Sequence, residues 1–505
     1  MDALSFRKAL LAAAAGALLA PLAAPARADE AGGPRQMSPE AKPVTHAEGG
    51  FAPDPSYENK PYSEQDQLKI YGGKYQVPNP RPMLELGRPM YTSGPLAASG
   101  HGFGAKNPTD QAFSIYGDWR TAFARNNDGT RSFNVLATRL NLDLDWKLTG
   151  TERVHAFLRP LDHKGDFTRC QSRGAAGGSR CELNVDAKFD TLFFEGDLGS
   201  IVAGATGRYQ SFDLPFAVGK MPLLFQNGVW MEDAITGAAF TIPARHSTAL
   251  DISNMDITFF AGLDNVNTPG IVDAARNPTF SNRAAGVNAF IESMRGYWEV
   301  GAARVEPKGA NFGLGYNTYA AAFTRRYFDR LSNSVRLIHS TGQNPASGAA
   351  ATANGTLLIV ENSLVTYKPL TLVPYLNVFY GNKAPQGVAR AADAGGILKN
   401  TGINFETDGL TGFPRLNDTA INTYGGALGV EYLFDLRRQF VVEVATVRAH
   451  GDVANRVIPG PQTALGMRYQ FAIDRAWIFR SDLILANREN LKDIAGLRFE
   501  IRRKF

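Results

Sequence analysis

The chain has 505 residues and a formal net charge of +5 at pH 7. Hydrophobic residues make up 44% of it, yet its mean hydropathy is slightly negative. A helical membrane protein needs repeated apolar runs of about 20 residues, and only one such run is present, at the N-terminus. The small positive charge, without a basic helix or an aromatic-basic platform, argues against nucleic-acid binding. The composition fits a soluble globular protein or a β-barrel, in which apolar residues occupy every second position.

The N-terminus predicts an export signal. Arg7 and Lys8 precede a short apolar stretch at 9–24, and residues 26–28 have a small-x-small cleavage pattern. We therefore expect residues 1–28 to be a signal peptide. A membrane anchor is the alternative, but the stretch contains a proline and is too short to span a bilayer comfortably.

Residues 29–110 differ from the rest of the chain. They are rich in Pro, Gly, Ala and Ser and show no sustained period, which predicts an extended or disordered periplasmic arm. A plug or a partner-binding segment is the alternative, because residues 65–91 contain enough aromatic and aliphatic side chains to dock.

The two cysteines, Cys170 and Cys181, form an isolated pair. In an exported protein such a pair predicts a disulfide that closes a small loop. Metal binding and redox chemistry are disfavoured because there is no CxxC or CxxCH motif.

From residue 111 to the end, polar and apolar residues alternate, which is typical of strands. The clearest case is 135–148, too long for most soluble sheets but suited to a tilted membrane-spanning strand. Segments 465–474, 477–485 and 495–505 repeat the pattern, whereas 356–368 is less regular. In 135–148 the polar face carries Arg139, Asn141, Asp143, Asp145 and Lys147.

Eight short turns, one of them at 197–200, alternate with nine longer loops. The resulting 17 connections predict 18 strands, or 16 if a pair is merged. In hydrocarbon every backbone polar group must be paired, so such a sheet must close. We therefore expect residues 111–505 to form an all-β, transmembrane, antiparallel up-and-down barrel of about 18 strands.

The polar faces of these strands would line the lumen. Both charge signs occur there, with arginine prominent, which predicts a hydrated pore that mildly favours anions. Each residue taken alone could simply be a solvated wall residue, and the Asp143/Asp145 pair is expected to be balanced by arginines rather than to serve acid–base or metal chemistry. The predicted pore-lining residues are Arg139, Asp143, Asp145, Arg153, Arg159, Arg468, Arg480, Asp482, Arg498, Glu500 and Arg502.

Two long loops are expected to shape the channel. The segment 212–232 is too apolar for an exposed loop, which predicts that it folds inward and narrows the pore. Packing on the rim or contact between subunits is the alternative. The loop at 383–421 is expected to cover the outer mouth or to be mobile. The residues assigned to the constriction are Phe216, Lys220, Leu224 and Phe225.

No common catalytic motif is present. The sequence lacks HExxH, GxSxG, a Walker P-loop and an EF-hand loop, so we expect no enzyme activity, no cofactor and no metal site. A barrel-embedded hydrolase with a dispersed site is the alternative.

With its export signal, alternating strands over 112–505 and a last strand GLRFEIRRKF, the sequence resembles the Gram-negative porin-type outer-membrane proteins. Phe499, Ile501 and Phe505 carry the match in the last strand. The resemblance implies an outer-membrane location, contact with outer-membrane lipid, and recognition of Phe505 by the barrel-assembly machinery. It also makes a homotrimer an option.

The function that this predicts is passive diffusion of small hydrophilic solutes through a porin-type channel. A selective channel for sugars or polysaccharides is one alternative. A sleeve around an electron-transfer or secretion partner is another.

Overall fold

The computed structural model describes residues 80–87, 99–163, 165–173, 178–273, 275, 277–309, 313–347, 349–366, 371–391, 393–406, 409–435, 437–452 and 456–505. All of them belong to one compact unit, residues 78–90 and 97–505. A second unit, residues 1–77 and 91–96, lies outside the described residues. The predicted signal peptide and most of the predicted arm therefore lie outside them too.

The described unit is an all-β barrel. Eighteen antiparallel strands pair in chain order, and the last strand pairs with the first, so the sheet closes as predicted. The strand number agrees with the prediction of 18 and not with the alternative of 16. The barrel strands are β2 (Thr109–Asn127), β3 (Ser132–Thr149), β4 (Arg153–Leu158), β8 (Phe189–Asp197), β9 (Pro215–Phe225), β10 (Met231–Ser247), β11 (Ile252–Val272), β12 (Pro278–Ser293), β13 (Gly296–Pro307), β14 (Tyr316–Tyr327), β15 (Leu331–Thr341), β16 (Asn354–Leu364), β17 (Leu372–Ala384), β19 (Thr423–Asp435), β20 (Arg438–Ala449), β21 (Gln462–Ala472), β22 (Trp477–Arg488) and β23 (Ile494–Lys504).

Several short elements supplement the wall. β6 (Asp166–Arg173) continues along β3 beyond the end of β4, and it pairs with β5 (Asp162–His163) and β7 (Ser179–Glu182). The predicted disulfide is present, and it joins Cys170 on β6 to Cys181 on β7. The remaining short elements are β1 (Leu84–Gly87), the helix α4 (Leu198–Thr206), the 3-10 turn η2 (Thr248–Leu250) and β18 (Ala389–Arg390).

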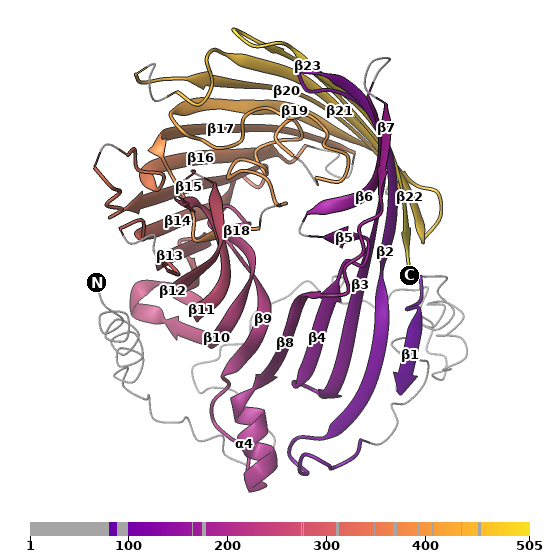
Figure 1. Ribbon diagram of the computed structural model, residues 1–505. Helices are drawn as coiled ribbons and strands as arrows, with labels where there is room; N and C mark the ends of the chain where they lie inside the picture. The colour runs from indigo at the N-terminus through magenta and orange to yellow at the C-terminus, as the bar shows by residue number, and fades with distance from the viewer. Residues whose placement is uncertain are drawn as a thin grey trace, which may run out of the picture. The chain divides into compact units, whose positions relative to one another are not determined.

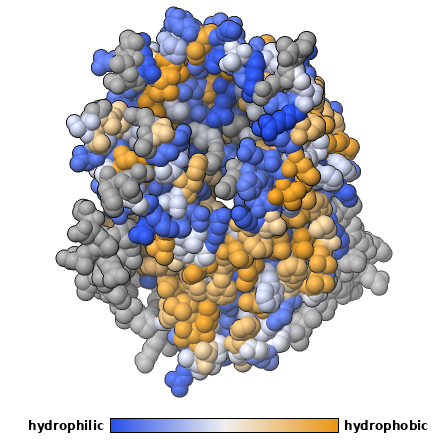
Figure 2. Space-filling model, viewed as in Figure 1, coloured by the Kyte–Doolittle hydropathy of each residue, from blue (hydrophilic) through white to orange (hydrophobic). Residues whose placement is uncertain are grey.

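The alternation of the sequence gives the wall two different faces. Trp119 and Leu136 are exposed on the outer surface, whereas Ala124 and Val135 on the same strands are buried on the inner side. Figure 2 shows hydrophobic side chains covering the surface over β8 and β9, where Leu192 and other apolar residues are exposed. Apolar outer side chains and a closed backbone are what a bilayer requires of a spanning sheet. Among the described residues, no helix has the length and apolar character needed to span a membrane.

The chain terminus lies at the end of the barrel that carries the short turns. Gly117 on β2 donates its backbone N–H to the carbonyl of Phe505 at 2.8 Å, and Phe505 donates to Gly117 at 3.1 Å. β1 pairs with β2 just beyond this point, at residues 112–115. Part of the predicted arm is therefore a short strand that pairs with β2 at the short-turn end of the barrel, beyond the end of β23.

The connection between β8 and β9 differs from the predicted short turn at 197–200. It contains α4, which begins where the side chain of Asp197 accepts a hydrogen bond from the Ser200 N–H. The helix ends at Gly207, whose φ of 70° lies in the left-handed region that favours glycine. The residues Leu198–Thr206 show no alternation of polar and apolar side chains. Alternation predicts strands and not helices, so this short helix was not predicted.

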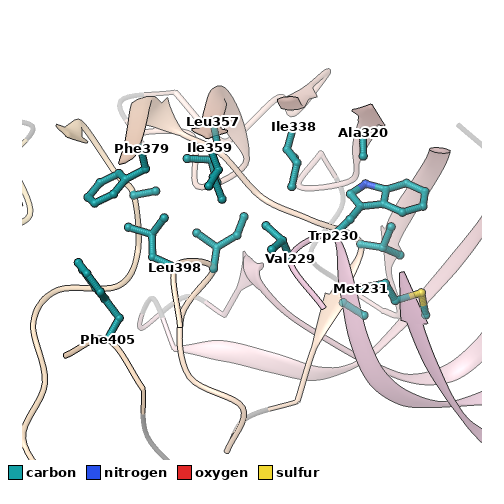
Figure 3. Close-up of a cluster of buried hydrophobic side chains, with 14 of the residues drawn as sticks. Val229, Trp230, Met231, Ala320, Ile338, Leu357, Ile359, Phe379, Leu398 and Phe405 are labelled. Carbon is teal, nitrogen blue, oxygen red and sulfur yellow. The ribbon is translucent and has the colours of Figure 1, made fainter. Parts of the chain in front are cut away.

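The long connection between β17 and β19 turns into the barrel. We call residues 385–422 the inward segment. Figure 1 shows β18 and the orange trace of this segment inside the ring of strands. The expectation that this loop covers the outer mouth or is mobile was wrong, because its apolar side chains pack against the inner wall. Figure 3 shows Leu398 and Phe405 facing Leu357, Ile359 and Phe379 of the wall, and the rings of Phe379 and Phe405 meet edge to face at 6.0 Å.

Candidate functional site

The register of three neighbouring strands places three arginines side by side on the inner wall. Arg120 on β2 lies opposite Arg139 on β3 and opposite Arg502 on β23. All three belong to the inward-facing rows, which also contain the buried residues Ala124 and Arg498. We call Arg502, Arg120 and Arg139 the arginine row. Like charges directly opposite each other destabilise a sheet, so the row has a cost that folding alone does not require.

Nearby polar groups hold the row in place. Arg120 Nε donates to Asp118 Oδ2 at 2.9 Å, and the same oxygen lies 3.7 Å from Arg502 Nε. Arg139 Nε donates to the neutral amide oxygen of Asn141 at 2.9 Å, and Arg502 Nη2 lies 3.3 Å from Glu500 Oε1. Asp118 and Glu500 thus pair with Arg120 and Arg502, whereas the carboxylates nearest Arg139, Asp162 and Asp393, act on it at longer range.

Arg159, just after β4, lies near Arg139 and is surrounded by carboxylates. Its guanidinium lies 2.8 Å from Asp190 Oδ2 and 3.2 Å from Asp162 Oδ2, and it also pairs with Asp393 of the inward segment. Burial raises the pKa of Asp393, but the nearby Arg159 more than offsets this, so the pKa lies below its ordinary value. Asp393 is therefore charged at neutral pH and ties the inward segment to this wall.

A second basic group surrounds Asp482 on β22. Asp482 lies opposite Arg468 on β21 and Arg498 on β23, and it accepts from Arg468 Nε at 2.7 Å and Arg480 Nε at 2.8 Å. Arg498 Nη2 is 3.1 Å away. Glu406 of the inward segment approaches the same arginines, at 2.5 Å from Arg468 Nη2. We call Asp482 together with Arg468, Arg480 and Arg498 the Asp482 cluster.

Nearer the short turns, the acidic residues Asp145 and Glu195 face basic side chains. Asp145 lies 3.7 Å from Arg153 Nη1 and 3.8 Å from His155 Nδ1, while His155 Nε2 lies 3.0 Å from Glu195. Asp145 is thus balanced by a neighbouring arginine. Within the described residues, no group of three or more His, Cys, Asp or Glu side chains has a geometry that could hold a metal ion.

The structure places the predicted pore-lining residues on the inward-facing rows or, for Arg159, immediately after one. Those on β21–β23 come together around Asp482, and Arg139 joins the arginine row. The sequence reasoning missed Arg120, although its alternation in 109–127 with Trp119 and Phe123 on the opposite face is a usable signal. Their role in conduction stays a prediction.

The predicted constriction loop needs correction. Residues Pro215–Phe225 form strand β9 of the wall. Phe216, Lys220 and Leu224 share the outward row with exposed Val218, whereas Phe225 faces inward and packs on Trp230 at 6.2 Å. Apart from Lys220, both faces of β9 are apolar, one against lipid and one against the interior cluster, so the alternation that marks other strands is absent.

The tip of the β9–β10 hairpin nevertheless crosses the inner wall. Gln226 donates its backbone N–H to Glu299 on β13 at 2.7 Å and accepts from Arg336 on β15 at 3.3 Å. Trp230 is fully buried and donates to Thr318 on β14 at 3.1 Å. Contacts with three successive strands show that residues 226–230 lean into the barrel.

The inward segment rests on this tip. β18 pairs in parallel with the start of β10, and Arg390 Nη2 donates to the Gly228 carbonyl at 2.6 Å. Glu232 lies 3.4 Å from Arg390 and also pairs with Lys399. The tip and the segment therefore form one inner layer.

The inner layer reaches the opposite wall. Asn126 on β2 donates to the Thr411 carbonyl at 2.9 Å, and Leu410 packs with Phe167 of β6 in a second buried cluster. With Asp393 at Arg159 and Glu406 at the Asp482 cluster, the segment spans the lumen from β10 to β2. The open cross-section is smaller than the 18-stranded wall alone would leave.

A cavity of about 600 Å³ lies between the inward segment and the outer connections. Its lining includes Lys383, Arg390 and Arg456 and, among the described residues, no acidic side chain. Hydrophilic side chains also gather around β5 and β6, as Figure 2 shows. Polar side chains thus occur on both sides of the segment, and the cavity on one side has a basic lining.

The architecture is that of a porin-type outer-membrane β-barrel. The closed wall of 18 strands and its apolar outer surface decide this, because such a wall satisfies what a lipid bilayer requires of a spanning sheet. No family model and no curated protein matches the chain.

The porin-type barrel is similar to solved structures at low sequence identity. Pseudomonas aeruginosa OccK7 (OpdD) is 11% identical, with 78% of this chain and 98% of that chain covered and a TM-score of 0.49. The outer membrane protein opdK from Pseudomonas aeruginosa is 10% identical, with coverage of 78% and 98% and a TM-score of 0.47. Acinetobacter baumannii OccAB4 is 9% identical, with the same coverage and a TM-score of 0.47.

Proposed function

We propose that this barrel is a channel for passive diffusion of small hydrophilic solutes and that its lumen favours anions. The observation that carries the proposal is the arginine row, in which Arg120 lies directly opposite both Arg139 and Arg502. Three cations at one height of the wall destabilise the sheet. The same three cations attract an anion that passes that height.

The inner layer supports small solutes. Because the inward segment reaches from β10 to β2, extended polymers and protein partners have little room in the lumen. The sleeve function, which needs an open bore, is disfavoured for this reason. A selective sugar channel remains compatible with a narrow polar lumen. Ion selectivity separates the two functions, because a sugar channel does not require a preference for anions.

Reversal potentials in a KCl gradient test the proposal. The purified barrel in a planar bilayer is expected to give stable open steps with a preference for chloride. R120Q is expected to reduce that preference, because it removes the central charge of the row. R245Q is the matched control, since Arg245 is exposed near the short-turn end of β10.

A clear preference of the wild-type channel for potassium would contradict the anion-favouring lumen. Absence of channel activity from correctly folded barrels would contradict the channel function itself.

A further inference from the structure

Glu406 is a carboxylate that the inward segment delivers to two wall arginines. We propose that Glu406 is a selectivity-determining residue: it acts as a tethered counter-ion that competes with passing phosphate-like anions for Arg468 and Arg480. The inference rests on the proposed channel function and names the residue that limits how strongly the wall binds anions.

The contacts of Glu406 are those of a bound anion. Its Oε2 lies 2.5 Å from Arg468 Nη2, and its Oε1 lies 3.6 Å from Arg480 Nη2. The two arginine side chains are 15% exposed, but the Glu406 side chain is 39% exposed. The carboxylate therefore sits on the open side of the arginine pair, where a solute would arrive.

The charge balance depends on Glu406. Arg468, Arg480 and Arg498 lie close to Asp482, and Arg498 Nη2 is 3.8 Å from Glu500. Glu500 is shared with Arg502 of the arginine row, at 3.3 Å, so Asp482 and Glu406 are the carboxylates that face the three arginines most directly. Removal of the Glu406 charge therefore makes this group more positive by one unit.

The inward segment is anchored just before Glu406 and again farther along the chain. Asn404 is fixed by Glu443, to which its backbone N–H donates at 2.9 Å, and the Phe413 ring lies 5.7 Å from the Arg498 guanidinium. A tethered group has a high effective concentration at its site. A free anion must displace it, so the site binds weakly and releases readily, as a conducting channel requires.

Glu406 is charged at neutral pH. Burial raises its pKa, but Arg468 and Arg480 more than offset this, and the pKa lies below its ordinary value. The nearby Asp482 acts in the opposite direction to the arginines. The tethered counter-ion is therefore present under the conditions in which the channel would work.

The test compares E406Q with E431Q by single-channel recording in KCl with added inorganic phosphate. Glu431 is a lumen-side residue of β19, two strands from Arg468 at the same height of the wall. Its side chain accepts from Gln439 at 2.5 Å, so E431Q makes the same charge change at a nearby carboxylate that is bonded to an amide instead of to the arginines. For E406Q the phosphate concentration that halves the current is expected to fall about tenfold, with a rise in chloride preference. For E431Q the half-blocking concentration is expected to stay near the wild-type value.

Equal effects of E406Q and E431Q, or no effect of E406Q, would overturn the proposal. Failure of the channel function shows up separately, as cation preference or silence of the wild type. If E406Q does not give folded barrels, E406D takes its place, because it keeps the charge but shortens the side chain. Its half-blocking concentration is expected to fall about threefold, and an unchanged value would again overturn the proposal.

Discussion

Glu443 on β20 holds Asn404 of the inward segment, and the preceding Ile403, by three N–H groups at a site with no solvent exposure. Its carboxylate accepts from the backbone N–H of Asn404 at 2.9 Å, from its side-chain amide at 2.8 Å and from the Ile403 N–H at 2.9 Å. Tyr375 adds a fourth hydrogen bond at 2.6 Å. A carboxylate on the wall thereby fixes a main-chain segment against the inner wall.

Replacement of Glu443 by alanine is expected to release the inward segment from the wall. Four donors would lose a buried partner, each at a cost of about 1–3 kcal/mol if left unsatisfied, and outward movement of the segment relieves that cost. Single-channel conductance is expected to rise and to fluctuate more than in the wild type. E431Q serves as the control, and an E443A channel with wild-type conductance would show that the segment is held elsewhere.

Replacement of residues 385–421 by a short Gly-Ser linker is expected to leave a folded barrel with several-fold higher conductance. The ends of the segment already meet, because Asn422 donates its N–H to the Lys383 carbonyl at 3.0 Å and its side chain accepts from the Lys383 N–H at 2.7 Å. Heat-modifiable mobility on a gel checks folding, and bilayer recording gives conductance. A folded barrel without this increase would exclude the segment as the narrowing element.

The contact between Arg159 and Asp393 is expected to be sensitive to strong acid. A carboxylate with a lowered native pKa stabilises the structure above its ordinary pKa, and this stabilisation is lost as pH falls through the native value. The ordinary value is 3.8, and Asp393 lies below it. The groups facing Asp393 are Arg159, Arg139 and Asp162.

Conductance of the wild type is therefore expected to stay constant from neutral pH to about pH 4 and to change below it. D393N lacks the titrating group and should not show the same acid transition. Identical acid profiles of the two proteins would assign the transition to another carboxylate.

Glu152 in the β3–β4 turn is expected to matter for stability rather than for conduction. It is 5% exposed, and it accepts from Asn107 Nδ2 at 2.7 Å, from Thr151 Oγ1 at 2.6 Å and from Thr149 Oγ1. E152A leaves these donors without their acceptor and should lower the free energy of unfolding by about 1–3 kcal/mol. Urea unfolding in detergent or lipid measures this, with conductance expected to be unchanged; T206A, on exposed α4, is the control.

The wall of the barrel was largely predictable from the sequence. Strands such as 135–148 turn one row of side chains to lipid and the other to the lumen. Every second residue is therefore apolar, and this alternation can be read from the sequence. The predicted strand number follows from the same signal together with the alternation of short and long connections. Strand β9 was missed because neither of its faces meets water, so its sequence carries no alternation.

The candidate site was predicted in its residue types but not in its arrangement. Arg468, Arg480 and Asp482 were expected to face the lumen, and the structure places them there. That Asp482 lies opposite both Arg468 and Arg498 depends on the register between β21, β22 and β23. Alternation within one strand fixes the face of a residue but not its height relative to the next strand.

The sequence by itself determined that this chain forms a closed antiparallel barrel that ends on Phe505, because hydrocarbon leaves a polar backbone no other way to pair. Only the tertiary structure decided what stands inside the barrel. The inward segment takes its place through contacts between residues far apart in the chain, such as Glu443 with Asn404 and Arg159 with Asp393. Such contacts depend on the three-dimensional positions of both partners, and no local pattern records them.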